Sequence, residues 1–583
     1  MDIKTIAPDL AVSPQITVQD VGIAASQGFR SVIINRPDGE STDQADHQAI
    51  EDAAKRLGLS VRYIPIVPGK VTDADVEAFD KAMHELPAPA LAYCRTGTRS
   101  ATLWALSQAG HLSTDVILKT VGGAGYDLSG LRARLEARDK AGEATTSDGI
   151  GRVKSHDVVI IGGGAAGIST AASILKRRGE VDIAIIEPRT EHYYQPGWTL
   201  VGGGVFKREQ TERQMATLMP KGVQWVRAAC AGFDPERNQV ILEDGTRIGY
   251  KVLVVAPGLK LNWDGIEGLK DTLGKNGVTS NYLFDMAPYT WELVQSMKGG
   301  RALFTQPPMP IKCAGAPQKA MYLACDAWKR RGVLKDIDVE FHNAGGALFG
   351  VKDYVPALMK YVDKYGINLC FNETLVAVDG AQKTAWFDVT NAEGNVTREA
   401  REFDMMHVCP PQTSLDFVAD SPLANEAGWV DVSGETLQHN QYGNVFGLGD
   451  AGSTPNAKTA AAVRKQAPVA AHNVLCVLDG KAPNAVYNGY GSCPLTVERG
   501  KIVLAEFAYG GKLDPSVPKW MLDGTKPTRA AWFLKEKMLP NIYFDMMLRG
   551  TETLAEPKLL PHRPASHEAQ EACDFKDAPS KVA

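Results

Sequence analysis

Several features that would assign a protein to a class at once are missing from this 583-residue chain. No uninterrupted apolar stretch reaches the roughly 18 residues that a membrane-spanning helix requires. No start-transfer pattern opens the chain, because its first residues include acids and a proline. The nine cysteines are too scattered for a disulfide scaffold. These absences predict a cytoplasmic protein.

An excess of charge of one sign is also missing. The formal net charge is −5, and charged residues make up 22% of the chain, which argues against a nucleic-acid partner. The apolar content of 44% is typical of globular proteins. The length corresponds to about three to four domain-sized units.

The motif around which the chain is organised lies near residue 160. Apolar residues 158–161 predict a buried parallel strand, and residues 168–176 predict a helix. Between them, Gly162, Gly164 and Gly167 form a G-x-G-x-x-G turn. In dinucleotide-binding folds such a turn brings a pyrophosphate against the N–H groups and dipole of the helix N-terminus.

An acid completes this fingerprint. Glu187 ends a second apolar strand, 183–186, and lies twenty residues after Gly167, where a carboxylate accepts hydrogen bonds from ribose hydroxyls. Ala165 and Ala166 lie inside the turn and belong to the same predicted cofactor site. An ordinary glycine-rich turn is the alternative, and the flanking strand, helix and acid argue against it.

Residues 1–137 are predicted to form a separate small α/β domain. Its expected strands are 32–35, 61–66 and 90–93, and its expected helices are 43–57 and 73–86. The last strand leads into Cys94-Arg-Thr-Gly-Thr-Arg-Ser, followed by a helix over 101–109. A thiolate placed there is stabilised by loop N–H groups and by Arg99, and an anion can bind beside it.

The loop from Cys94 to Arg99 resembles two families. Four residues separate the two side chains, as in rhodanese sulfurtransferases, whereas tyrosine phosphatases have five. The surrounding segment 28–40 resembles phosphatase-like proteins that are often joined to sulfur-metabolism enzymes. This resemblance implies that Cys94 carries a persulfide while the loop and Arg99 hold the donor or acceptor. Whether the domain keeps phosphatase activity is left open.

Polar, glycine-bearing residues 138–154 are predicted to be a linker, and a second unit is expected over 155–556. The block 192–204, rich in aromatic residues, prolines and glycines, resembles the corresponding segment of sulfide:quinone oxidoreductases of the mitochondrial-like type. The resemblance continues through 252–259, 312–319, 435–439, 444–450, 458–462 and 491–495, and it reaches 541–550. It implies two tandem dinucleotide-binding folds and FAD as the cofactor.

Residues in and near the later motifs support a flavin site. Asp450 ends a predicted strand from residue 445, where its carboxylate can bond a ribityl hydroxyl, and a helix from Lys458 can direct its N-terminus at the flavin. The resemblance further implies that Gln195 and Lys319 contact FAD. It also implies that the strand around Cys230 passes the adenine, with Cys230 itself a packing residue.

The second nucleotide fold, expected over about 297–410, lacks the glycine turn that a nicotinamide dinucleotide requires. After the predicted strand 301–305 the chain has prolines and Cys313 in that place. NADH and NADPH are therefore not expected partners. Cys313 lies beside Lys312 and Lys319, whose charges favour a thiolate.

The resemblance pairs Cys313 with Cys493 as the redox-active cysteines. It implies that sulfide attacks Cys493, which keeps the sulfur as a persulfide, and that freed Cys313 reduces FAD, from which quinone removes the electrons. Whether the pair rests as a disulfide or is bridged by sulfur is left open. Cys325, Cys370, Cys409 and Cys476 lie in apolar segments and are expected to be core residues.

The segment 528–550 mixes aromatics, methionines and lysines, which suits an amphipathic helical segment on a bilayer, with Trp532, Phe533, Tyr543 and Phe544 as anchors. A helix docked on the core is the alternative, and the resemblance favours the membrane. The enzyme is then peripheral on the inner face of the cytoplasmic membrane. Residues 557–583 are expected to be disordered.

Together these observations predict an α/β flavoprotein with a phosphatase-like N-terminal domain, two Rossmann-like folds and a C-terminal amphipathic helical segment. The expected activity is sulfide:quinone oxidoreduction with rhodanese-like transfer of the sulfur to a small thiol or sulfite. No metal site is predicted, and the oligomeric state, including a homo-oligomer, is left open. The alternatives are an NAD(P)H-dependent disulfide or persulfide reductase with an N-terminal phosphatase, and a flavin-based sulfide sensor.

Overall fold

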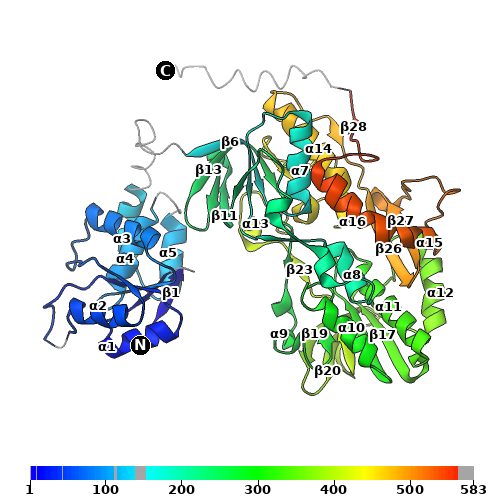
Figure 1. The fold of residues 1–583 in the computed structure, drawn as a ribbon, viewed down its shortest axis with the longest axis horizontal. Helices are drawn as coiled ribbons and strands as arrows, with labels where there is room; N and C mark the ends of the chain where they lie inside the picture. Colours follow the sequence, from blue (N-terminus) through cyan, green and yellow to red (C-terminus); the bar gives the residue numbers. More distant parts are fainter. Residues whose placement is uncertain (1, 8–9, 43, 110–113, 138–152, 562–583) are drawn as a thin grey trace. The chain divides into compact units, whose positions relative to one another are not determined.

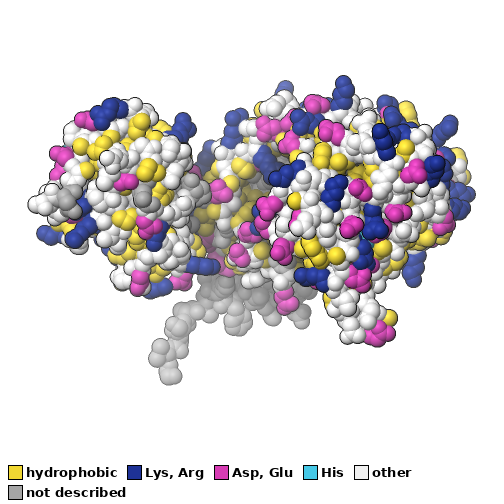
Figure 2. All heavy atoms as spheres, turned by 90° about the horizontal axis from the view of Figure 1, so that it is seen from below, with side chains coloured by type: hydrophobic (Ala, Val, Ile, Leu, Met, Phe, Trp, Pro, Cys, Tyr) yellow, Lys and Arg dark blue, Asp and Glu magenta, His cyan; other side chains and the backbone are white. Residues whose placement is uncertain are grey.

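The computed structural model describes residues 2–7, 10–42, 44–109, 114–137 and 153–561. The chain divides into a smaller unit, Met1–Lys154 with Asp244–Arg247, and a larger unit that contains the rest. Most of the predicted linker, 138–152, lies outside the described residues. Figure 2 shows acidic and basic side chains mixed over the visible face of the larger unit.

The smaller unit is a five-stranded sheet between two layers of helices (Figure 1). The strand order is β1 (Lys4–Ala7), β2 (Leu10–Ser13), β5 (Ala90–Tyr93), β3 (Ser31–Ile34) and β4 (Ser60–Tyr63). One face packs against α1 (Val18–Ser26) and α2 (His47–Arg56), and the other against α3 (Asp73–Glu85), α4 (Thr98–Ser107) and α5 (Thr114–Gly123). The central strand β5 pairs in parallel with β2 and β3, so its carboxyl end delivers Cys94 to the middle of the sheet edge.

The expected helix at 43–57 begins later, at His47, because the Asp46 side chain caps its first turn through the Gln48 N–H. The expected helix at 101–109 begins earlier, at Thr98. This shift places Arg99 in the first turn of α4, directly after the cysteine loop. The N-cap is Gly97, whose φ of 87° favours glycine.

The larger unit begins with a seven-stranded sheet. Six strands follow the order β10 (Gln224–Val226), β7 (Ile183–Ile186), β6 (Lys154–Ile161), β13 (Arg247–Val255), β12 (Gln239–Leu242) and β11 (Cys230–Asp234), and β24 (Val445–Gly447) pairs with β13. Helices α7 (Ala165–Arg177) and α14 (Ala460–Leu478) share one core with this sheet. The predicted strand, glycine turn and helix are therefore confirmed as β6, Gly162–Gly167 and α7.

A second parallel sheet follows, in the order β15 (Val278–Thr279), β22 (Met405–His407), β16 (Gly300–Gln306), β17 (Ile337–Asn343) and β18 (Asn368–Phe371). One face packs against α11 (Ala316–Arg331) and α12 (Val355–Tyr365). The other packs against the antiparallel strands β19 (Glu373–Asp379), β20 (Thr384–Thr390) and β21 (Val396–Glu402). These two sheets confirm the predicted tandem Rossmann-like architecture.

A hairpin and a helical segment complete the larger unit. The hairpin, β26 (Gly491–Glu498) and β27 (Lys501–Phe507), shares a core with α11. The predicted C-terminal helical segment is confirmed over residues 529–549, with α15 (Arg529–Phe533) continuing into π-helical turns at Leu534–Met538 and Ile542–Met546. Among the described residues, no helix combines the length and apolar character needed to cross a bilayer.

Two expectations about the C-terminal part are wrong. Tyr543 and Phe544 are buried and pack against Tyr194, so they are core residues and not membrane anchors. The disordered tail does not begin at residue 557, because β28 (Lys558–Leu559) pairs with β25 (Ala485–Val486). Backbone hydrogen bonds to the neighbouring strand order this short stretch. The remainder of the predicted tail, 562–583, lies outside the described residues.

Candidate functional site

The first candidate site lies where the glycine turn meets α7. No heavy atom lies within 4 Å of the position that a Gly164 Cβ would occupy, and no side chain caps the helix there. The N-terminal N–H groups of α7 therefore face open space, as a bound pyrophosphate requires. By contrast, a Cβ on Gly167 would lie 1.9 Å from the Gly162 carbonyl oxygen, so this glycine serves close packing within the turn.

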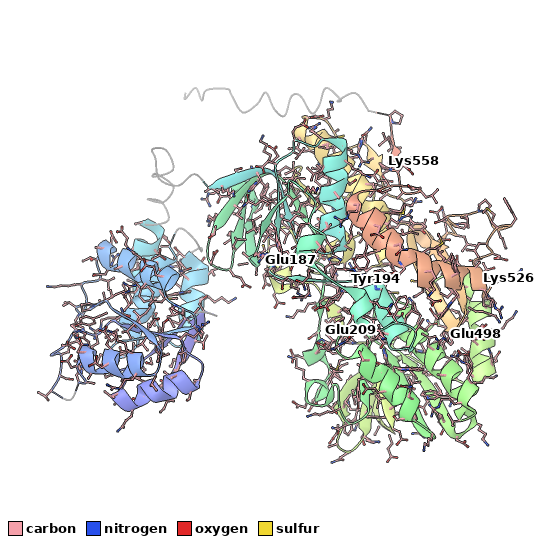
Figure 3. All side chains as sticks on the ribbon, viewed as in Figure 1. Glu187, Tyr194, Glu209, Glu498, Lys526 and Lys558 are labelled. Carbon is pink, nitrogen blue, oxygen red and sulfur yellow. The ribbon has the colours of Figure 1, made fainter. Side chains whose placement is uncertain are left out.

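Glu187 follows β7 and is labelled in Figure 3. Its carboxylate accepts hydrogen bonds from the N–H groups of Gly163 at 2.8 Å and Arg189 at 2.9 Å. The acid is thus fixed beside the glycine turn. Ala165 and Ala166 are the first two residues of α7. A Cβ built on Gly449 would lie 3.1 Å from the Ala166 Cβ, so the two segments approach closely there.

That close approach brings the second predicted cofactor motif to the first. Asp450 lies in a single 3-10 turn, Gly449–Ala451, directly after β24. Lys458 precedes α14, which begins at Ala460 and not at Lys458 as expected, because the Thr459 hydroxyl caps the helix through the Ala462 N–H. The Lys458 ammonium donates to the carbonyl oxygens of Asp450 and Gly452 and lies 4.0 Å from the centre of the Trp429 ring. Burial lowers the pKa of Lys458 to about 8.

Gln195 joins these motifs to the cysteine segment. Its side-chain oxygen accepts a hydrogen bond from the Lys312 ammonium, which also lies 3.9 Å from the Asp450 carboxylate. Cys230, on β11, is buried, and burial raises its thiol pKa to about 12, as suits a packing residue. The open N-terminus of α7 and the polar groups gathered beside it fit a dinucleotide cofactor such as FAD.

The second candidate site is built from two cysteines far apart in the sequence. Cys493, on β26, and Cys313 pack in one core, and the Lys319 ammonium on α11 donates to the Cys313 sulfur at 3.1 Å. The structure therefore brings together the two cysteines that the resemblance pairs.

The electrostatics of the two sulfurs differ. The hydrogen bond from Cys493 holds the pKa of Cys313 well below its usual range, against the effect of burial, and the Lys319 charge adds to this lowering. The same hydrogen bond, together with burial, raises the pKa of Cys493 well above its usual range. The Lys319 ammonium, 3.1 Å from Cys313, favours the thiolate on that sulfur.

The backbone holds Cys313 in an unusual conformation. Its φ is 51°, in the left-handed region that a residue with a side chain rarely adopts. The Cys313 N–H donates to the Lys458 carbonyl oxygen at 2.9 Å, and the Tyr282 hydroxyl donates to the Lys312 carbonyl oxygen. These bonds tie the cysteine segment to the predicted flavin motif, and strain of this kind is typical of reactive sites.

Lys535 is a residue of this site that sequence analysis missed. It lies in the π-helical stretch of the C-terminal segment, is only 5% exposed, and its side chain contacts Lys319. Burial, and then the Lys319 charge, hold the pKa of Lys535 well below its usual range. From sequence alone, a lysine among aromatic residues indicates a residue at an interface. Lys535 was missed because π-helical turns change which side chains face inward.

His192 is a second missed residue, and it ties the C-terminal segment to the glycine turn. Its ring nitrogens hydrogen-bond the Gly163 carbonyl oxygen and the Tyr543 hydroxyl. Burial lowers its pKa to about 4, so the ring is neutral near pH 7.

The third candidate site is the loop of the smaller unit. Cys94 is buried, and its sulfur accepts the Gly97 N–H at 3.2 Å. Arg99 interacts electrostatically with Cys94, and its guanidinium donates two hydrogen bonds, at 2.6 and 2.7 Å, to the Glu40 carboxylate. No local pattern around residue 40 indicates this carboxylate partner.

Comparisons with known proteins find relatives of both units of the chain. Residues 2–111 match the family model of the phosphatase-like domain of beta-lactamase hydrolase-like proteins, and residues 156–286 match that of pyridine nucleotide-disulphide oxidoreductases. A beta-lactamase hydrolase-like protein of Xylella fastidiosa is 35% identical over 22% of this chain and 30% of its own length.

The larger unit has relatives over most of their length. The mitochondrial sulfide:quinone oxidoreductase of Dictyostelium discoideum is 43% identical over 67% of this chain and 86% of its own length. The solved sulfide:quinone oxidoreductase of Aquifex aeolicus has the same fold, with a TM-score of 0.55 and 20% identity over 73% of this chain and 96% of its own. The chain therefore belongs to the sulfide:quinone oxidoreductase family of FAD-dependent enzymes, which oxidise sulfide with quinone, and carries a phosphatase-like domain at its N-terminal end.

Proposed function

We propose that Cys313 and Cys493 perform the sulfide oxidation as a redox pair. The observation that carries this proposal is the packing of Cys313 and Cys493 in one core, with the Lys319 ammonium 3.1 Å from the Cys313 sulfur. Sulfurs in contact can form a disulfide, and the fixed charge stabilises the thiolate that its opening releases.

The difference in pKa between Cys313 and Cys493 indicates which sulfur of the oxidised pair hydrosulfide attacks. Hydrosulfide attacks the Cys493 sulfur of the oxidised pair, the bond between the cysteines breaks, and Cys313 leaves as a thiolate. Attack at Cys493 is favoured because the thiol of lower pKa is the better leaving group. Cys493 then holds the sulfur as Cys493–S–SH. Bound FAD supplies the two-electron carrier between the cysteines and quinone.

A small thiolate takes the outer sulfur from Cys493. In the net reaction, hydrogen sulfide, a thiol RSH and quinone give the persulfide RSSH and quinol, so that two electrons pass from sulfur to quinone with two protons. Lys319 holds the negative charge of Cys313 between the steps. Burial and the Lys319 charge lower the pKa of Lys535, which favours its neutral form, and that form can take the proton that the incoming sulfide loses.

Alanine in place of either cysteine tests this assignment. Cys313→Ala and Cys493→Ala are each expected to abolish bleaching of the flavin absorbance by sulfide under anaerobic conditions, while the FAD content stays native. The matched control is Cys325→Ala, a buried cysteine on α11 whose pKa is raised by burial. Native bleaching in either active-site variant removes that cysteine from the mechanism.

The residues proposed to hold FAD are those gathered around the glycine turn. Gly162, Gly164, Ala165, Ala166 and Gly167 position the N–H groups of α7 for the pyrophosphate, and Glu187 lies beside them for the ribose. Further proposed contacts are Gln195, Lys319, Asp450, Lys458 and the strand at Cys230.

Cys94 is proposed to receive the sulfur that the larger unit releases. Its sulfur already accepts a backbone N–H, and Arg99 lies next to it, so a persulfide there has donors for its negative charge. Cys94→Ser is expected to leave sulfide-dependent quinone reduction intact while free RSSH accumulates in place of transferred sulfur. Unchanged products, with phosphate-ester hydrolysis by the native chain, would support the phosphatase alternative that the family match suggests.

Membrane attachment from the cytoplasmic side is proposed on the exposed apolar residues of the C-terminal part. Trp520 is 84% exposed and Phe533 is 58% exposed. Their neighbours Leu522, Trp532 and Leu534 pack together over β27, which places the two segments side by side. Trp520→Ser with Phe533→Ser is expected to release the enzyme from quinone-containing vesicles. Unchanged sedimentation with the vesicles would argue against this attachment.

A further inference from the structure

The Arg99 guanidinium of the cysteine loop is already engaged by a carboxylate. Its two terminal nitrogens donate to the two Glu40 oxygens at 2.6 and 2.7 Å, and one of them also donates to the Ile66 carbonyl oxygen at 2.6 Å. This is the paired geometry with which arginine binds carboxylate or phosphate. Glu40 therefore occupies the donors that two oxygens of a phosphate or sulfate group would use.

Glu40 is held firmly in this place. Arg36, which is buried, donates from Nε to Glu40 at 2.9 Å, and its other nitrogens are fixed by Gln15 and Ser41. The hydrogen bond from Arg99 holds the pKa of Glu40 below its usual range, so the carboxylate is charged at neutral pH. An inorganic dianion entering the loop would find the paired Arg99 donors already occupied by Glu40.

From this arrangement we propose that Glu40 sets the substrate class of the Cys94 loop: it excludes phosphate and thiosulfate dianions and admits the persulfide of a small thiol. The inference rests on the proposed sulfur transfer at Cys94. A persulfide carries at most one charge on its sulfane sulfur and does not need the paired guanidinium donors. The neutral Tyr126 hydroxyl also lies against the loop, 2.1 Å from where a Gly97 Cβ would be.

The transfer step balances without an added oxidant. The Cys94 thiolate attacks the outer sulfur of RS–SH, the S–S bond of the donor breaks, and a new S–S bond forms at Cys94. The electron pair of the broken bond leaves with RS⁻, and the proton stays on the transferred sulfur. The products are Cys94–S–SH and RS⁻, and no net oxidation takes place.

The experiment compares Glu40→Gln with Asp38→Asn in the full-length chain. Asp38 belongs to the same loop but hydrogen-bonds His47 and not Arg99, so it is a matched carboxylate control. The first measurement is the ratio of sulfur-transfer rates with glutathione persulfide and with thiosulfate as donors. The second is protection of Cys94 by inorganic phosphate against iodoacetamide, followed by peptide mass analysis.

Glu40→Gln is expected to shift the donor ratio toward thiosulfate at least tenfold and to strengthen phosphate protection by a similar factor, with Asp38→Asn unchanged. An unchanged donor ratio and unchanged protection in Glu40→Gln would overturn the inference. If Glu40→Gln fails to fold, the phosphate measurement on the native chain tests the inference. Protection of Cys94 by submillimolar phosphate would contradict the exclusion of dianions. Absence of protection at high phosphate concentration would support it.

The outcome for sulfur transfer is separate from the outcome for Glu40. Absence of transfer from either donor in the native chain and in Glu40→Gln would overturn the proposed function of Cys94. The phosphate measurement would still decide whether Glu40 excludes dianions.

Discussion

The two nucleotide-type folds of the larger unit begin their first helix in opposite ways. In the first fold, Gly164 opens α7 onto free space. In the second, a Cβ on Gly315 at the start of α11 would lie 2.3 Å from the Leu495 side chain of β26, so the equivalent helix N-terminus is covered by protein. The first fold leaves its helix N–H groups open to a cofactor, whereas in the second the strand that carries Cys493 lies against the start of the helix.

This difference shows how one topology serves two chemistries. In both folds a parallel strand ends beside a helix N-terminus, where backbone donors and the helix dipole favour negative charge. In the first fold the charge belongs to a ligand. In the second it belongs, in the proposed mechanism, to the thiolate of Cys313, with the second sulfur on the β26 hairpin that covers the helix start.

The largest expected effect comes from filling the open helix N-terminus. Gly164→Val has room within the protein and an ordinary backbone conformation, so the fold should hold. The new side chain occupies the space of the pyrophosphate, and we expect FAD affinity to fall at least tenfold, about 1.4 kcal/mol. Flavin content per chain and the thermal unfolding midpoint together test this. Full flavin content would mean that the cofactor does not use this helix end.

The opposite result is expected from the covered helix N-terminus. Gly315→Ala forces buried Leu495 away, at a cost of about 1 to 3 kcal/mol for overpacking. We expect native flavin content but sulfide-dependent flavin reduction slowed about tenfold, because β26 carries Cys493. The double variant with Leu495→Ala restores the space and should recover the rate. A loss of flavin in Gly315→Ala would contradict the division of roles between the folds.

A smaller effect is expected from removing the charge beside the thiolate. In the reduced enzyme, Lys319→Met should raise the pKa of Cys313, which the lysine charge helps to lower. Alkylation requires the thiolate, so its rate falls as the pH drops through the pKa, and in the variant this fall occurs at higher pH. At a pH below its raised pKa, the variant holds less Cys313 thiolate than the native chain, so its alkylation is slower. Mass-resolved iodoacetamide labelling of Cys313 between pH 5 and 9 measures the profile. An unchanged profile would assign the low pKa to the Cys493 hydrogen bond alone.

The smallest expected effect is the response to nicotinamide cofactors. Because Leu495 covers the N-terminus of α11, NADH without sulfide should bleach the flavin at less than about one hundredth of the sulfide rate, a barrier difference of about 3 kcal/mol. Stopped-flow absorbance under anaerobic conditions gives both rates. Comparable bleaching by NADH would support the alternative reductase activity and remove the contrast between the two folds.

Local sequence pattern was enough to predict the features that reside in short segments. Gly162, Gly164 and Gly167 between an apolar strand and a helix predicted the first nucleotide fold, and four residues between Cys94 and Arg99 identified the loop of the smaller unit. These features follow from strand and helix periodicity and from glycine conformations, which are properties of short segments. The resemblance, and not periodicity, paired Cys313 with Cys493.

Packing between elements determines which distant groups meet. The contact of Lys535 with Lys319, the hydrogen bond between His192 and Tyr543, and the pairing of Glu40 with Arg99 each join residues from separate elements. Burial also decides the role of Tyr543 and Phe544. These two residues belong to the core, although aromatic residues in such a segment suit a membrane surface. A charge or an aromatic ring has the same local sequence whether it faces water, lipid or a sulfur atom, because its surroundings come from segments far away in the chain.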